Sequence, residues 1–182
     1  MGSSLKNKLR AISVHPNAEP AARQEGRGLL RTRHERDVNA DALVFPSDGL
    51  RRIGWSGRAF DIRECLFLDT ETTGLSGGAG TVAFLVGLGY ISGEKLVIEQ
   101  LLMRDYADEP ALIAALGEIM GRFRFVCTFN GRTFDMPLLE SRFTMCRMRK
   151  QWRDLENLDL LIPARRTWKL RLENCRLSCI EK

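Results

Sequence analysis

Two carboxylates stand at the end of an apolar stretch near the middle of the chain. The sequence LFLDTETTGLSGG runs from Leu66 to Gly78 and places Asp69 two residues before Glu71. Side chains of a strand alternate between its two faces, so both carboxylates are expected on the same side. Like charges side by side repel, and burying them is costly unless a cation compensates. The spacing therefore predicts a cation site.

A third carboxylate, Asp135, lies in a second polar stretch, TFNGRTFDMPLL. Asp69, Glu71 and Asp135 are hard oxygen ligands, which suit Mg²⁺ or Mn²⁺ rather than zinc. Two such ions about 4 Å apart can activate a water and stabilise the leaving oxygen of a phosphodiester. Asp135 also precedes an apolar run with an early proline, so a role as a plain helix N-cap is the alternative.

Hydroxyl and amide groups surround these carboxylates in the sequence. Thr72 and Thr73 supply hydroxyls, and Gly74 allows the backbone to approach a phosphate closely. Asn130 has the chemistry to hold a ligand or a nearby backbone group. Because Gly131 follows it, a simple turn is the alternative for Asn130.

The elements that must position these residues alternate in type, which indicates an α/β fold. Short turns join the first three strands into an antiparallel meander, and the later helical connections add parallel strands to give a mixed sheet. Catalytic groups gather at the carboxyl ends of strands in such sheets, and the first and fourth strands are expected to be neighbours. The pattern predicts strands over residues 65–70, 81–91, 95–103 and 123–130, and helices over 108–123, 134–148 and from 171 onward.

Details of these helices can also be predicted. Asp108 is expected to cap the first helix, whose buried stripe is Leu112, Leu116, Ile119 and Met120. In the second helix, Leu138, Phe143 and Met145 are available to the core.

Charge and the positions of prolines and glycines divide the chain into segments. Residues 1–55 contain several prolines and glycines and predict a basic, loosely structured segment that docks back or contacts a protein partner, with the folded domain over 56–182. Residues 61–140 carry 12 acidic and 6 basic groups, whereas 141–182 carry 5 acidic and 11 basic groups. An acidic centre beside basic segments suits a protein that holds metal and phosphate, although solvated surface alone would give the same balance.

Composition excludes other classes. No apolar run reaches the ~20 residues of a membrane helix, so no membrane association is expected. The polar, basic start shows no secretory signal, which predicts a cytoplasmic protein. The five cysteines form no CxxC pair and are expected to be free thiols, with Cys65 and Cys127 buried.

The two polar stretches carry a resemblance to a known family. DTETTGL resembles the first motif of the DEDD 3′–5′ exonucleases, and FNGRTFDMPLL resembles their second motif. Together with the later LDLL and LENCRLSCIE stretches, the chain from Glu64 to Lys182 is similar to the YprB-type ribonuclease H-like family. The resemblance implies a ribonuclease H-like fold, with Asp69 and Glu71 binding one ion, Asp135 the second, and Asn130 matching the second-motif Asn. Asp159 matches a recurring family position but is not expected to be a ligand.

One part of the family pattern is not matched. The third motif, a His or Tyr shortly before a fourth Asp, is expected beyond Lys182, so the resemblance predicts a domain that is C-terminally incomplete. The histidines, His15 and His34, and the tyrosines, Tyr90 and Tyr106, stand elsewhere.

Three functions therefore compete. The first is a metal-dependent nuclease that acts on DNA or RNA through two ions. The second is a catalytically incomplete nucleic-acid-binding module, a remnant of such a nuclease, and the third is an α/β interaction domain. For nucleic-acid binding, arginines 142–153, interleaved with Phe143 and Trp152, are a possible track, with a solvated helix face as the alternative.

Overall fold

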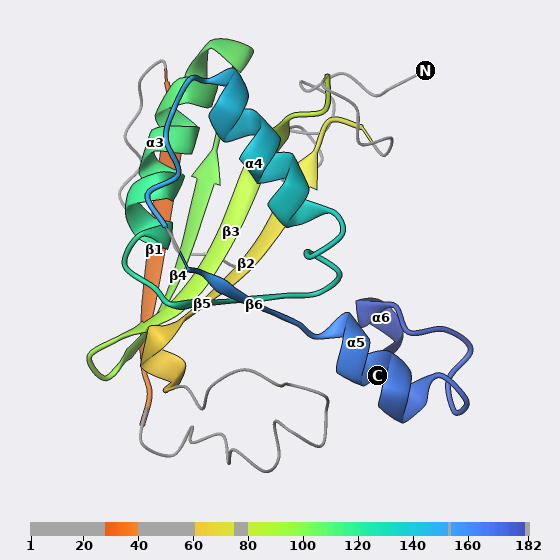
Figure 1. Cartoon of the computed structure of the whole chain (residues 1–182). Coiled ribbons are helices and arrows are strands. Elements are labelled where there is room, and N and C mark those ends of the chain that lie inside the picture. The colour runs from red at the N-terminus through yellow and green to blue at the C-terminus, as the bar shows by residue number, and fades with distance from the viewer. Residues whose placement is uncertain (1–27, 40–60, 75–79, 153, 181–182) are drawn as a thin grey trace.

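The computed structural model describes residues 28–39, 61–74, 80–152 and 154–180 of the 182-residue chain. Within these ranges, six strands form one sheet in the order β1-β4-β3-β2-β5-β6 (Figure 1). The strands are β1 (Leu30–Asp37), β2 (Cys65–Thr72), β3 (Ala83–Ser92), β4 (Lys95–Leu102), β5 (Phe125–Thr128) and β6 (Glu156–Asp159). The helices are α3 (Glu109–Met120), α4 (Asp135–Met145), α5 (Leu161–Trp168) and α6 (Leu177–Ile180), with short 3₁₀ turns at Ile62–Glu64 and Tyr106–Asp108.

Strand directions confirm the predicted mixed sheet. β2, β3 and β4 form an antiparallel meander, while β5 pairs in parallel with both β2 and β6. The tight turn between β3 and β4 depends on Gly93, whose φ of +61° is easily adopted by glycine. β2 and β5 are neighbours, as expected, so their carboxyl ends lie together.

The main core lies between the sheet and helices α3 and α4. Leu66 and Leu68 of β2 and Val97 and Leu101 of β4 point into this core, while Phe67, Ile98 and Gln100 point to the other face. The predicted stripe of α3 is confirmed, because all four of its residues are buried. Burial of these apolar side chains is the main force that holds both helices on the sheet.

A buried ion pair ties the two helices together. Arg142 of α4 donates two hydrogen bonds to the carboxylate of Glu109 in α3, with N–O distances of 2.5 and 2.6 Å. The side chains are 9% and 12% exposed, so this bidentate pair is largely removed from solvent. Arg142 therefore holds helix against helix and is not available to an external phosphate.

Strand β1 is where the structure departs most from the sequence. Residues 1–55 were expected to be loosely structured, but Leu30–Asp37 pairs along its whole length with β4 as an edge strand. The sequence LRTRHERD has no apolar alternation, and most of its residues are exposed. Hydrophobic patterning therefore gives no signal for this strand.

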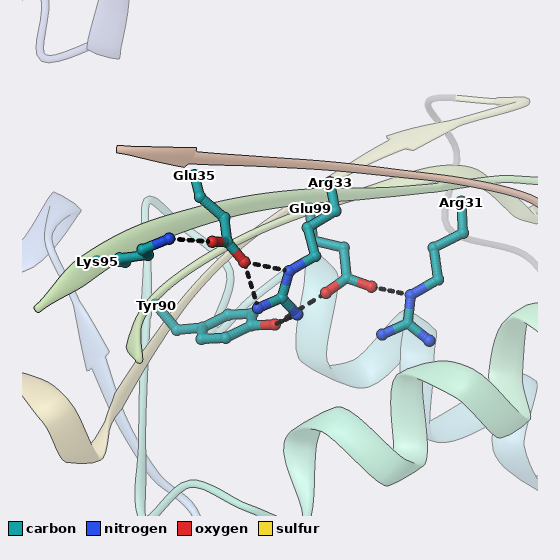
Figure 2. A network of polar contacts seen from close by, with 6 residues as sticks. All are labelled: Arg31, Arg33, Glu35, Tyr90, Lys95 and Glu99. Atoms are coloured by element: carbon teal, nitrogen blue, oxygen red, sulfur yellow. Dashed lines mark hydrogen bonds and ion pairs between the residues drawn. The ribbon is translucent and has the colours of Figure 1, made fainter. Parts of the chain in front are cut away.

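Polar contacts compensate for the small apolar contribution of β1 (Figure 2). Glu99 of β4 is fully buried and accepts hydrogen bonds from Arg31 of β1 and from the Tyr90 hydroxyl, the latter at 2.9 Å. Arg33 donates to that hydroxyl at 3.1 Å and also to Glu35. This network fixes β1 against the sheet.

Smaller expectations are corrected as well. The Asp108 side chain does not cap α3, because it accepts hydrogen bonds from the preceding backbone amides of Arg104 and Asp105. Met145 is 58% exposed and lies outside the core, whereas Phe143 is buried as expected. The helix expected from residue 171 is limited to the four residues of α6.

Other sequence-based expectations concern thiols and membranes. All five cysteines are free, and Cys65 and Cys127 are buried, as predicted. Within the described ranges, no helix is long and apolar enough to span a bilayer. Residues 1–27, the first part of the segment expected to be loosely structured, lie outside the described residues.

Candidate active site

Strand β2 carries two of the three carboxylates at its end. Asp69 and Glu71 alternate with buried Leu68 and with Thr70, so they project to the same face, as their spacing predicts. Asp69 stands opposite Gly87 of β3, and the pairing of β2 with β3 shifts register just after Glu71. The irregularity ends the regular ladder where the polar residues begin, a common position for a bulge near a functional site.

Asp135 comes to β2 through the neighbouring strand β5. The chain leaves β5 at Thr128, crosses a short loop and enters α4, of which Asp135 is the first residue. Asp135 is 8% exposed, and the hydroxyl of Thr70 donates to its Oδ1 at 2.5 Å. Thr70 was not among the predicted site residues, and its position between two carboxylates was the available signal.

Asp69 and Asp135 line a common cavity of about 260 Å³. Of the predicted site residues, Asp69, Thr72, Gly74, Asn130 and Asp135 border it. The other residues along its wall are Thr70, Thr81, Phe129, Phe134 and Leu138.

Glu71 and Thr73 are not among the residues that border this cavity. The Thr73 hydroxyl accepts a hydrogen bond from the Val82 backbone amide at 3.1 Å, which joins the residue after β2 to the residue before β3. The Thr72 hydroxyl donates to the Gly74 carbonyl at 2.9 Å. A direct substrate role for either hydroxyl stays a prediction, while their contacts with Gly74 and Val82 are visible.

The surroundings of the two cavity carboxylates disfavour their ionised forms. Burial raises the pKa of Asp69, and the nearby charge of Glu71 raises it further. Burial also raises the pKa of Asp135, and the charge of Asp69 adds to this, while the hydrogen bond from Thr70 acts in the opposite direction. A bound cation would relieve both effects, because it favours the charged carboxylates.

The donor set matches the predicted metals only in part. Carboxylate oxygens are the ligands that Mg²⁺ and Mn²⁺ prefer, and Asp69 and Asp135 supply them from two elements. Among the described residues, no three His, Cys, Asp or Glu side chains gather into a ready metal-binding group. Two of the three predicted ligands thus share the cavity, and Glu71 lies beside it on the same strand face.

Comparison with known proteins identifies the family of the chain. A sequence profile described as the RNase_H superfamily matches residues 66–182, which include all three carboxylates. The chain belongs to the RNase H superfamily. It is also 34% identical over 129 residues to a Bacillus subtilis (strain 168) protein named "Uncharacterized protein YprB". That alignment covers 70% of this chain but 31% of the relative, so the chain spans about a third of the relative's length.

A residue of the RNase H domain that the sequence did not assign to the site holds the loop between β5 and α4. Asp159, at the end of β6, is 5% exposed and accepts three backbone hydrogen bonds. Its oxygens accept from the amides of Asn130 at 2.7 Å, Arg132 at 3.1 Å and Leu161 at 3.0 Å. Asn130 itself has a φ of +67°, a conformation that asparagine tolerates better than most residues. Asp159 is therefore a positioning residue for the loop that leads to Asp135.

Gly131 in this loop of the RNase H domain is fixed by steric contact. A Cβ atom at this position would lie 2.5 Å from the Cβ of Thr128, which is too close for any side chain. We expect Gly131→Ala to lower the free energy of unfolding by about 1–3 kcal/mol, because the loop must shift. Urea denaturation would measure this. The control Gly80→Ala, with no atom within 4 Å of its added methyl, should be nearly neutral, and equal effects would contradict the steric explanation.

The raised pKa of Asp135 gives this RNase H site a predictable pH dependence. Its ionised form is disfavoured in the folded state, so stability falls as pH rises from the ordinary value of 3.8 through the raised pKa. We expect Asp135→Asn, which keeps an acceptor for Thr70, to stabilise the metal-free protein by about 1 kcal/mol at neutral pH. Thermal unfolding in EDTA would show this gain, and it should vanish as pH falls below the ordinary value. A gain that persists in acid would contradict a charge effect.

Part of the predicted basic track is engaged in contacts within the protein. Arg142 pairs with Glu109, and Lys150 pairs with Glu140 at 2.5 Å. Phe143 is buried and packs edge-on against Trp152, with 4.9 Å between ring centroids. These contacts assign the start of the segment to packing between α3, α4 and the following loop.

Proposed function

We propose that this RNase H superfamily domain is a metal-dependent nuclease that hydrolyses phosphodiester bonds of DNA or RNA. The observation that carries the proposal is the common cavity, into which Asp69 from β2 and Asp135 from α4 bring two carboxylates. Their raised pKa values are consistent with a pair of carboxylates that binds a cation. This chain spans about a third of its relative's length. Any activity of a full-length protein that contains this domain is therefore also part of the proposal.

Each residue has a role in this proposal. Asp69, Glu71 and Asp135 would hold Mg²⁺ or Mn²⁺, which would activate a water and stabilise the leaving oxygen of the phosphodiester. The Thr70 hydroxyl orients Asp135 through its hydrogen bond, a contact of the kind that tunes metal ligands. Asp159 holds the loop backbone in place.

The cavity wall would contact the substrate. Thr72, Gly74 and Asn130 border the cavity and offer small or polar surfaces to the terminal nucleotide. Glu71, the third predicted ligand, does not border this cavity. That observation favours a second candidate, a module that binds nucleic acid without cutting it.

Cleavage of end-labelled single-stranded DNA and RNA by the purified chain with Mn²⁺ tests the proposal. We expect metal-dependent shortening from the 3′ end, the polarity that the family resemblance implies. Asp69→Asn should reduce the rate by more than about 100-fold, since even residues that only orient a metal ligand contribute 10–100-fold. Glu118→Gln, which removes an exposed carboxylate on α3, is the control and should retain activity.

The other outcomes decide between the two candidates. No cleavage together with retained binding of both strands would support the binding module and reject the nuclease for this chain. Cleavage that is unchanged in Asp69→Asn would show that the activity does not come from this cavity.

A further inference from the structure

Helix α5 and the turn after it present an unusual group of cations. Between Leu161 and Ile180 the chain carries five basic residues and one acidic residue, Glu173. All five basic side chains are exposed, and none forms an ion pair with a residue in the described part of the chain. They are Arg165, Arg166, Lys169, Arg171 and Arg176, called here the α5 basic surface.

Three of these cations form a stripe on the outer side of α5. Lys169 lies four residues after Arg165 and three after Arg166, so on a helix the three side chains are neighbours. Leu161 and Ala164 of α5 are buried, whereas all three cations are exposed to solvent. Like charges at this spacing destabilise a helix, and a bound polyanion would remove that repulsion.

Several other basic side chains in the described structure are neutralised by the protein itself. Arg31 pairs with Glu99 and Arg142 with Glu109, and Lys95, Arg124 and Lys150 each contact a carboxylate at 3.0 Å or less. The α5 basic surface has no such partner among the described residues. Its charge is therefore available to an external group.

Apolar side chains stand among these cations. Trp168 is 37% exposed, and Leu170, between Lys169 and Arg171, is 97% exposed. Exposed aromatic groups among Arg and Lys are the usual components of single-stranded nucleic-acid binding, where bases stack and phosphates pair with the cations. A partner recognised by charge alone would not require the aromatic ring.

The α5 basic surface is attached to the candidate active site through β6. α5 begins two residues after Asp159, whose carboxylate holds the amides of Asn130 and Leu161. The same anchor therefore positions both the cavity loop and the start of α5. Figure 1 shows α5 and α6 together beyond the end of β6, away from α3 and α4.

We propose that the α5 basic surface binds the phosphate backbone of single-stranded nucleic acid, as a contact additional to the carboxylate cavity. The inference takes its substrate class from the proposed function, but it does not require that the chain cleaves its substrate. Arg165, Arg166 and Lys169 contact phosphates, and Trp168 offers a face for a base. An acidic protein or an anionic membrane is the competing partner for the same charge.

Fluorescence anisotropy of a labelled oligothymidylate and oligouridylate, each of about 16 nucleotides, tests this surface in EDTA, where cleavage cannot occur. We expect the triple variant R165Q/R166Q/K169Q to bind about tenfold or more weakly near physiological salt. The slope of log affinity against log salt should fall by about 2, because each phosphate contact on a single strand contributes about 0.7. Trp168→Leu should weaken binding with little change in this slope.

The control variant K95Q/R124Q/K150Q removes the same charge from exposed residues that the protein already pairs. It should keep most of the affinity and of the salt slope. Equal losses of affinity in both triple variants would show that only net charge matters, and would overturn the proposal. Unchanged binding in R165Q/R166Q/K169Q would also overturn it. Thermal unfolding of each variant confirms that the fold is intact, which separates binding from a purely structural role at the helix end.

Two further arms separate this inference from its alternatives. If the wild-type chain binds phosphatidylserine vesicles but not the oligonucleotides, and the triple variant loses the vesicles, the surface is a membrane contact and the proposal is wrong. If the chain does not cleave but binds oligonucleotides through Arg165, Arg166 and Lys169, the nuclease proposal fails and this one stands. If the wild-type chain cleaves and the triple variant binds as tightly as the wild type, the nuclease proposal stands and this one fails.

Discussion

Replacing Arg31 by methionine should destabilise the fold by about 3–5 kcal/mol, the cost of leaving a buried charge without its partner. Glu99 is fully buried, and Arg31 from β1 is its ionic partner (Figure 2). In the variant, the hydrogen bond from the Tyr90 hydroxyl would be left to compensate the carboxylate, with Arg33 near the ring. Urea denaturation would measure the loss.

The two partners of this pair should respond unequally. The Arg31 side chain is 46% exposed and can be hydrated without Glu99, so Glu99→Gln should cost less, about 1–2 kcal/mol. The double variant R31M/E99L should recover much of the stability lost in R31M, because it removes the buried charge altogether. Equal losses of unfolding free energy in R31M and E99Q would show that the burial of Glu99 does not determine the cost of breaking the pair.

Asp159→Asn should damage both stability and the candidate site. The carboxylate accepts backbone hydrogen bonds at both oxygens, and an amide would turn a donor NH₂ group towards one of these amides. We expect a loss of about 2–3 kcal/mol in urea denaturation, since hydrogen bonds to charged groups are the stronger kind. In the cleavage assay, the misplaced loop should lower the rate by about 10–100-fold, as for residues that orient metal ligands.

Asp154→Asn is the matched control for Asp159→Asn. It makes the same chemical change at an exposed position shortly before β6. It should leave both stability and cleavage close to the wild-type values. If Asp159→Asn leaves the cleavage rate unchanged although the protein is destabilised, Asp159 supports the fold without positioning the site.

The sequence predicts those parts of the fold that depend on apolar periodicity. β2, β3 and β4 and the buried stripe of α3 are confirmed because their residues bury a regular face. β1 was not predicted, because LRTRHERD is held by pairing with β4 and by the Glu99 network, which involves residues far away in the chain. Such contacts leave no local signal.

The candidate site follows the same division. Asp69 and Asp135 could be predicted to meet, because strand order brings the ends of β2 and β5 together. The position of Thr70 between two carboxylates was a signal, but its partner Asp135 and the role of Asp159 depend on the path of the loop after β5. The predicted nucleic-acid track is wrong at Arg142 for a similar reason, because the partner of Arg142, Glu109, comes from another helix.

Strand β1 also has a consequence for solubility. The sheet ends at β1 on one side and at β6 on the other, and both strands are polar, LRTRHERD and ENLD. Charged edge strands discourage pairing with strands of other molecules. Without β1, the apolar strand KLVIEQLL would become the edge and offer its unpaired backbone to other chains. A strand that contributes little to the core therefore protects the protein from aggregation.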